Sequence, residues 1–101
     1  MNRDEFVEKT KQQLDEWNAR LKEWEAEMHK AQAGLKAQYQ TQLKEFERQR
    51  DEMMKRMKEV QSASQSAWGD LSKGLEEAWQ TMSSSFEKAW SEFQKKKDKS
   101  D

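Results

Sequence analysis

The sequence predicts an all-α protein of long amphipathic helices, a coiled-coil helical hairpin with an 11-residue tryptophan repeat in its C-terminal helix. Helical spacing of the apolar residues is the first observation behind this prediction. The second is that the 101 residues include no proline and only three glycines, among many strong helix formers. Only 33% of the residues are apolar and 39% are charged, which is typical of solvated helices and poor material for a globular core.

Residues 1–61 are predicted to form one long heptad helix. Their apolar positions alternate by three and four residues, as in the seam of a left-handed coiled coil. The spacing slips to two successive gaps of four between Leu35 and Leu43, which is a stutter that locally unwinds a supercoil. Gly34 lies just before the stutter. The sequence is compatible with a kink near residues 34–39 and with an unbroken helix.

A serine-rich turn is expected at residues 62–66, where the charged residues stop and serines alternate with other residues. Serine competes for backbone hydrogen bonds and favours helix caps. Ser64 or Ser66 is therefore expected to cap the next helix, with Asp70 near its positive end. One continuous helix through this segment is the alternative.

Residues 67–96 are predicted to form the repeat helix. A phrase that begins with Ala-Trp occurs three times at intervals of 11 residues, which is about three turns of α-helix. Its apolar residues form a stripe on one face that must be buried against a partner helix or another surface. The stripe consists of Trp68, Leu71, Leu75, Trp79, Met82, Phe86, Trp90 and Phe93. Three lysines at 95–97 suit the end of a helix, and residues 97–101 are expected to form a basic, polar tail.

A chain reversal within the serine-rich turn places residues whose numbers sum to about 128 opposite each other. This register pairs Phe46 with Met82 and Tyr39 with Trp90, so that apolar residues meet on both sides. The sequence therefore favours an antiparallel hairpin of residues 35–94.

That hairpin leaves an apolar seam in the first part of the long helix, and nothing else in the chain is expected to cover it. A second copy is the economical partner, so a homodimer or a higher oligomer is expected. The oligomer seam consists of Leu14, Trp17, Leu21, Trp24 and Met28.

No catalytic, cofactor-binding or metal-binding residues are predicted. His29 is the only histidine and the chain has no cysteine, so the usual ligands of a zinc site do not come together. Carboxylates occur at every spacing along charge-balanced helices, whereas general acid and base catalysis needs a cleft that shifts their pKa values. We find no phosphate-binding loop or nucleophile motif. We expect neither an enzyme nor a small-molecule substrate.

Charge and hydropathy restrict the partners and the location. The 19 basic and 20 acidic residues give a formal net charge of −1, so nucleic-acid binding is not expected. No secretory signal or membrane-length apolar run is present, and a cytoplasmic location is expected. Tryptophan-bearing 11-residue repeats also resemble those of exchangeable lipid-binding proteins, so a membrane surface or a client protein is the alternative partner. The five acidic residues and two lysines of segment 67–94 disfavour an anionic membrane.

The opening RDEFVEKTKQQLDEWNARL and the later SASQSAWGDLSKGLEEAW resemble a family of small bacterial coiled-coil proteins. That family is largely uncharacterised, and some members are labelled stress-response proteins. The resemblance spans nearly the whole chain and implies a bacterial cytoplasmic protein tied to stress, with no catalytic residue or cofactor. The expected function is that of a non-enzymatic helical interaction and self-assembly protein.

Overall fold

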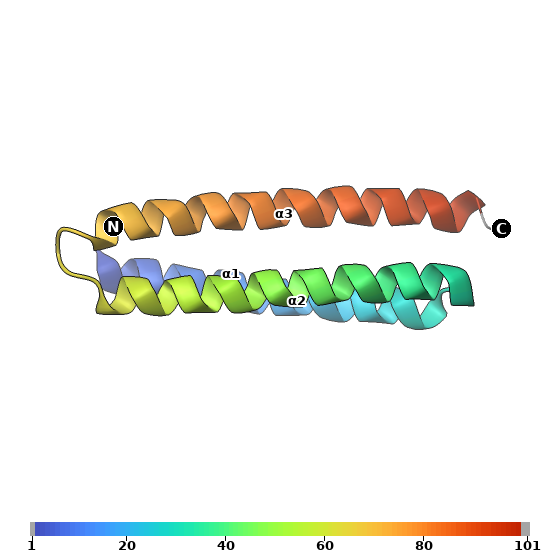
Figure 1. Cartoon of the computed structure of the whole chain (residues 1–101), viewed down its shortest axis with the longest axis horizontal. Helices are drawn as coiled ribbons and strands as arrows, with labels where there is room; N and C mark the ends of the chain where they lie inside the picture. The colour runs from blue at the N-terminus through green and yellow to red at the C-terminus, as the bar shows by residue number, and fades with distance from the viewer. Residues whose placement is uncertain (1, 100–101) are drawn as a thin grey trace.

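The computed structural model describes the backbone of residues 2–99 and the side chains of residues 2–96. The described chain forms three α-helices: α1 (Arg3–Lys30), α2 (Ala33–Ser62) and α3 (Trp68–Lys99). They pack side by side in a rod of 55 × 17 × 17 Å, in which α1 and α3 run parallel and α2 runs antiparallel to both (Figure 1). The predicted all-α class is confirmed, including the hairpin and the aromatic repeat in the C-terminal helix.

The prediction of one helix over residues 1–61 is wrong, because the chain leaves the helical conformation at Ala31 and Gln32. Both residues are extended, with φ and ψ of −76° and 152° at Ala31 and of −68° and 157° at Gln32. Gly34 does not cause the break, since it lies inside the first turn of α2. The stutter that begins at Leu35 coincides with the start of this new helix.

The helix breaks at Ala31 and Gln32, although both residue types have good helix propensity, because the break allows α1 to pack against α2. Leaving the helix at Ala31 and Gln32 sacrifices well under about 1 kcal/mol of intrinsic propensity per residue. Folding back lets the seam of α1 bury itself against α2, and each large apolar side chain removed from water contributes about 1.5–3 kcal/mol. Trp17 and Trp24 of α1 both become completely inaccessible to solvent. Burial therefore outweighs local propensity at this position.

The start of α1 is fixed by a cap and by contacts with the other end of α2. The Asn2 side chain accepts a hydrogen bond of 2.8 Å from the backbone N–H of Glu5, and its amide donates to the Glu5 carboxylate at 3.2 Å. This reciprocal arrangement resembles a capping box. The Arg3 guanidinium donates to the Gln61 carbonyl and to the Gln65 side chain, each at 3.2 Å. These bonds hold the first turn of α1 beside the second interhelical connection.

The second connection occupies residues 63–67, one residue later than the turn expected at 62–66, and the alternative of a continuous helix is wrong. Ala63 has φ of −72° and ψ of 154°, close to the values at Ala31. Ser64 Oγ accepts a hydrogen bond of 3.3 Å from the N–H of Ala67, as a capping serine does. Asp70 lies in the first turn of α3, where a negative charge is favourable.

The end of α3 also differs from the expectation. The repeat helix was expected to end at residue 96, and α3 continues to Lys99. Differences of a turn or less are common at helix ends, where the last turn frays. The side chains of the expected tail at 97–101 lie outside the described part of the structure.

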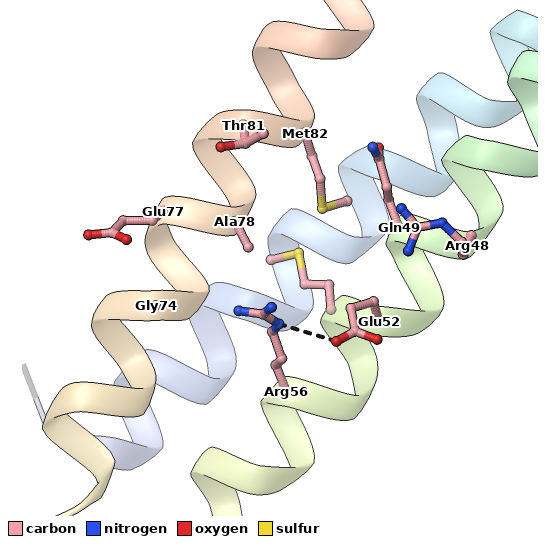
Figure 2. A pocket seen from close by; sticks show the side chains of 10 residues that line it. Arg48, Gln49, Glu52, Arg56, Gly74, Glu77, Ala78, Thr81 and Met82 are labelled. Carbon is pink, nitrogen blue, oxygen red and sulfur yellow. Dashed lines mark hydrogen bonds and ion pairs between the residues drawn. The ribbon is translucent and has the colours of Figure 1, made fainter.

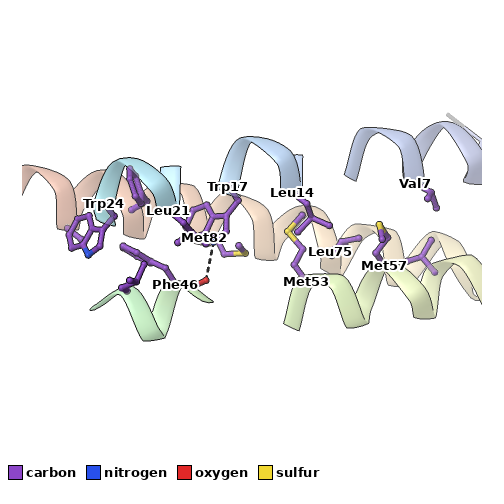
Figure 3. Close-up of a cluster of buried hydrophobic side chains, with 14 of the residues drawn as sticks. Val7, Leu14, Trp17, Leu21, Trp24, Phe46, Met53, Met57, Leu75 and Met82 are labelled. Carbon is purple, nitrogen blue, oxygen red and sulfur yellow. Dashed lines mark hydrogen bonds between the residues drawn. The ribbon is translucent and has the colours of Figure 1, made fainter. Parts of the chain in front are cut away.

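The core is a single apolar cluster that runs along the axis of the rod (Figure 3). Thr10 is the one buried polar residue among those described, and its hydroxyl donates to the Phe6 carbonyl at 3.0 Å. That bond satisfies the hydroxyl within its own helix. The buried hydrophobic residues are Phe6, Val7, Leu14, Trp17, Leu21, Trp24, Tyr39, Leu43, Phe46, Met53, Met57, Val60, Leu75, Met82, Phe86, Ala89 and Phe93.

Candidate interaction surface

The predicted oligomer seam is covered by the chain itself. Leu14, Trp17, Leu21 and Trp24 are buried, and Met28 is partly buried against the same core. The premise that nothing in the chain covers this seam is wrong, because α1 folds back onto α2 and α3 also packs against it. A homo-oligomer stays a prediction, but this seam no longer motivates it.

Two indoles of α1 make hydrogen bonds to the backbone of α2. Trp17 Nε1 donates to the Phe46 carbonyl at 3.0 Å, and Trp24 Nε1 donates to the Tyr39 carbonyl at 2.9 Å. Figure 3 shows the first of these bonds within the core. A buried indole N–H needs an acceptor, and a helical carbonyl has a second lone pair available. These bonds orient both rings and connect α1 to α2.

The hairpin of α2 and α3 forms as predicted, but its register is shifted by about one helical turn. Phe46 lies against Phe86 with ring centroids 5.3 Å apart, and Tyr39 lies against Phe93 at 4.5 Å. The expected partners were Met82 for Phe46 and Trp90 for Tyr39. The connection extends to residue 67 before α3 begins, which moves the centre of the turn toward the C-terminus.

The numbers of Arg50 and Trp79 sum to 129, so the predicted register also places these two residues opposite each other, but no cation–π contact joins them in the described structure. Arg50 instead donates to the Asn18 side chain on α1 at 3.4 Å and pairs with Asp51 at 3.3 Å. Trp79 lies against Trp17 with centroids 6.0 Å apart. Trp79 and Trp90 therefore contact tryptophans of α1. The sequence-based hairpin of residues 35–94 did not include α1.

The predicted stripe on α3 divides into a buried part and an edge. Leu75, Met82, Phe86 and Phe93 belong to the core. Trp68, Trp79 and Trp90 are only partly buried, and Leu71 is 37% exposed. The 11-residue repeat therefore places its indoles at the border of the bundle rather than at its centre.

The edge indoles fill the space between α3 and α1. Trp79 meets Trp17 edge-on, while Trp90 lies 6.2 Å from Trp24 and stacks on Phe86 at 5.9 Å. Of the three helix pairs, α1 and α3 approach each other least closely. Large aromatic side chains act as spacers here, so the edge of the rod between α1 and α3 is wider and rich in tryptophan.

A groove between α2 and α3 is lined in part by small residues of α3. Gly74 and Ala78 of α3 line a groove of about 530 Å³ opposite Gln49 and Arg56 of α2 (Figure 2). A Cβ atom on Gly74 would lie 4.0 Å from the Arg56 guanidinium. Glu77, Thr81 and Met82 of α3 line the same groove, so it is a mixed surface of small, polar and apolar side chains.

A second groove of about 380 Å³ lies between α1 and α3. Phe86 and Trp90 supply its apolar wall, while Glu23 and Glu87 supply carboxylates. The Arg20 guanidinium lies over the Phe86 ring at 5.3 Å, and its Nη1 atom is buried without a hydrogen-bond partner in the described structure. Cations favour aromatic faces. The groove is thus aromatic, charged and open to solvent.

The charged side chains that shift their pKa values lie on the outer surface, away from this edge. Arg48 hydrogen-bonds to Glu45 and holds the pKa of that carboxyl below its usual value, while the Arg48 pKa is raised by the same pair. Both residues are solvent-accessible, and exposed pairs contribute little to stability. They give no sign of a catalytic centre.

Other signals of function are sparse. No group of three or more potential metal ligands occurs within the described part of the chain. Between residues 3 and 99, none of the helices combines the length and the apolar character that a membrane crossing requires. The chain matches no protein-family model, no curated protein and no solved structure. The edge between α1 and α3 is therefore the strongest candidate for a functional surface.

Proposed function

We propose that this chain is a non-enzymatic helical interaction protein that assembles with itself through the edge between α1 and α3. The observation that supports the proposal is the row of partly buried indoles at Trp68, Trp79 and Trp90 along this edge. Tryptophan is enriched at protein interfaces and often dominates their binding energy. A row of three such side chains offers anchors for a partner helix.

Mass measurement by light scattering across concentrations, combined with circular dichroism, tests the proposal. The wild-type mass should rise from monomer toward dimer with concentration. Trp68→Gln should lower the affinity of association and leave the helical content unchanged, because Trp68 lies at the end of the bundle and is only partly buried. Met54→Gln is the matched control, since Met54 is 39% exposed on α2. A monodisperse monomer at every concentration would contradict self-assembly.

A second candidate function is reversible binding of a membrane surface or of an unfolded client protein. The observation that favours it is that α3 is the most amphipathic of the three helices. Such a helix, released from α1 and α2, would suit an interface between water and an apolar phase. Tryptophan emission distinguishes this candidate: a blue shift is expected with zwitterionic vesicles. Absence of a shift, together with no suppression of client aggregation, would remove it.

The setting that we propose is a bacterial cytoplasm under stress, and it rests on the sequence resemblance. Deletion of the gene should then reduce survival under heat or osmotic stress, and the wild-type chain should restore it. The Trp68→Gln variant should restore survival less well if the indole edge is the functional surface. Equal survival of the deletion strain and its parent would contradict a role in stress.

A further inference from the structure

The indole repeat is symmetric about its middle member. Trp68 and Trp90 each lie 11 residues from Trp79, and an 11-residue step returns to nearly the same face of a helix. A two-fold axis that crosses α3 at Trp79 therefore places Trp68 opposite Trp90 of an antiparallel second copy. Three indoles at equal spacing are self-complementary under this operation, as an isologous interface requires.

The contacts between α1 and α3 show where the same axis crosses α1. Trp79 contacts Trp17, and Trp90 contacts Trp24. Together with the ion pair of Lys9 and Glu76 at 3.9 Å, these contacts place α3 residues level with α1 residues whose numbers are 62 to 67 lower. The position level with Trp79 is therefore in the neighbourhood of Gln13. Gln13 is half-buried and follows Lys9 by one helical turn on the side of α1 that faces α3.

Charges on α1 are complementary about this axis. Glu16 follows Gln13 by three residues and Lys9 precedes it by four, so all three lie on one side of α1. An axis near Gln13 brings Lys9 opposite Glu16 of the second copy, and the symmetry repeats the pair. Each dimer would contain two such pairs of opposite charge.

The carboxylates on the edge of α3 also avoid one another. An axis at Trp79 pairs residues whose numbers sum to 158, which places Glu76 opposite Met82 and next to Ser83 of the second copy, and Glu87 opposite Leu71 and next to Ser72. Both serines are half-buried. The Ser72 hydroxyl donates to the Gly69 carbonyl of its own helix at 2.9 Å, so Ser83 is the serine whose hydroxyl can donate to a carboxylate of the second copy. Antiparallel docking therefore places neither Glu76 nor Glu87 opposite an acidic residue of α3 in the second copy.

The size of the edge fits a dimer. One side of the rod measures about 55 by 17 Å, and a stable interface takes roughly 800 Å² from each partner. We propose that the partner of the edge between α1 and α3 is a second copy of this chain, docked antiparallel with the two-fold axis passing close to Trp79 and Gln13. This inference rests on the proposed function of self-assembly and specifies how the two copies are arranged in the dimer.

Cysteine cross-linking tests the axis in a chain that has no native cysteine. A residue on a two-fold axis meets its own copy, and a disulfide needs Cα atoms within about 7 Å. Gln13→Cys should therefore oxidise to a covalent dimer. Lys55→Cys, on the exposed outer face of α2, is the control and should stay monomeric. An equimolar mixture of Ser72→Cys and Glu87→Cys chains should give the mixed dimer, which a parallel arrangement would not.

A charge exchange provides an independent readout. Lys9→Glu should weaken the dimer about fivefold, because two opposite-charge pairs become repulsive at an exposed surface. Glu16→Lys should do the same, and the double variant should regain the wild-type dimer affinity. Circular dichroism should show unchanged helicity in all three variants. If the wild-type chain dimerises but Gln13→Cys does not cross-link and the double variant does not regain affinity, the proposed axis is wrong and self-assembly still holds. A monomer at all concentrations would contradict both the axis and self-assembly.

Discussion

The indole nitrogen of Trp24 donates a hydrogen bond of 2.9 Å to the backbone carbonyl of Tyr39, across the two-residue connection between α1 and α2. Trp17 and Phe46 repeat the arrangement one heptad further from that connection. The residue numbers sum to 63 in both pairs, so both report the same antiparallel register. Its centre falls at Ala31 and Gln32, where the helix breaks.

The Trp24 hydrogen bond gives a first prediction. Trp24→Phe keeps an aromatic ring but removes the donor and part of the buried volume. The free energy of unfolding should fall by about 2 kcal/mol, which combines a lost hydrogen bond with a small cavity. Urea unfolding measures the loss. Trp68→Phe is the matched control and should change stability by less than half as much, because the Trp68 indole is only partly buried and makes no hydrogen bond in the described structure. Equal losses in the two variants would contradict a special role for the Trp24 donor.

The layer formed by Phe46 and Phe86 gives a second prediction. The two rings lie 5.3 Å apart, and both are buried. Each single change to alanine should cost about 3–5 kcal/mol of unfolding free energy, and the double variant should cost less than the sum because the residues share one packed layer. Met54→Ala is the control and should cost less than about 0.5 kcal/mol, since Met54 is an exposed surface residue. Strict additivity would indicate that the two rings do not share a layer.

The register of α2 and α3 gives a third prediction. The ring contacts of Phe46 with Phe86 and of Tyr39 with Phe93 place Leu75 nearer to Met57 than Leu71 is. A cysteine pair replacing Met57 and Leu75 should therefore oxidise within one chain faster than a pair replacing Met57 and Leu71. Non-reducing electrophoresis and peptide mass mapping follow the reaction. Faster closure of the second pair would support the register expected from the sequence.

The cap at Ser64 gives a fourth prediction. Ser64→Ala removes the hydroxyl acceptor for the Ala67 N–H and leaves the Ser64 carbonyl as its remaining acceptor, so it should lower the free energy of unfolding by about 0.5 kcal/mol. Ser84→Ala is a matched control on the exposed surface of α3. It should raise stability by a few tenths of a kcal/mol, since alanine has the higher helix propensity. Thermal unfolding of the two variants should therefore shift in opposite directions, and a shift in the same direction would argue against the cap.

The sequence alone predicted the helical class, the stripe of α3 and the serine-rich region of the second connection. These features follow from local spacing and composition: the 11-residue repeat places Trp68, Trp79 and Trp90 on one face whatever lies opposite. Ser64 or Ser66 was expected to cap from its chemistry and its place before the repeat, and the structure selects Ser64. Patterns of this kind depend on a few neighbouring residues and can be recognised without the tertiary structure.

Tertiary structure decided which surfaces cover those stripes. Ala31 and Gln32 carry no proline or glycine signal, and they leave the helix because folding back buries Trp17 and Trp24. That gain comes from contacts far apart in the sequence, which periodicity does not reveal. The same fold moves the seam of α1 from a proposed oligomer interface into the core and leaves the tryptophan repeat at the edge. Periodicity determines which residues share a face, whereas the free energy of burial over the whole chain determines what that face contacts.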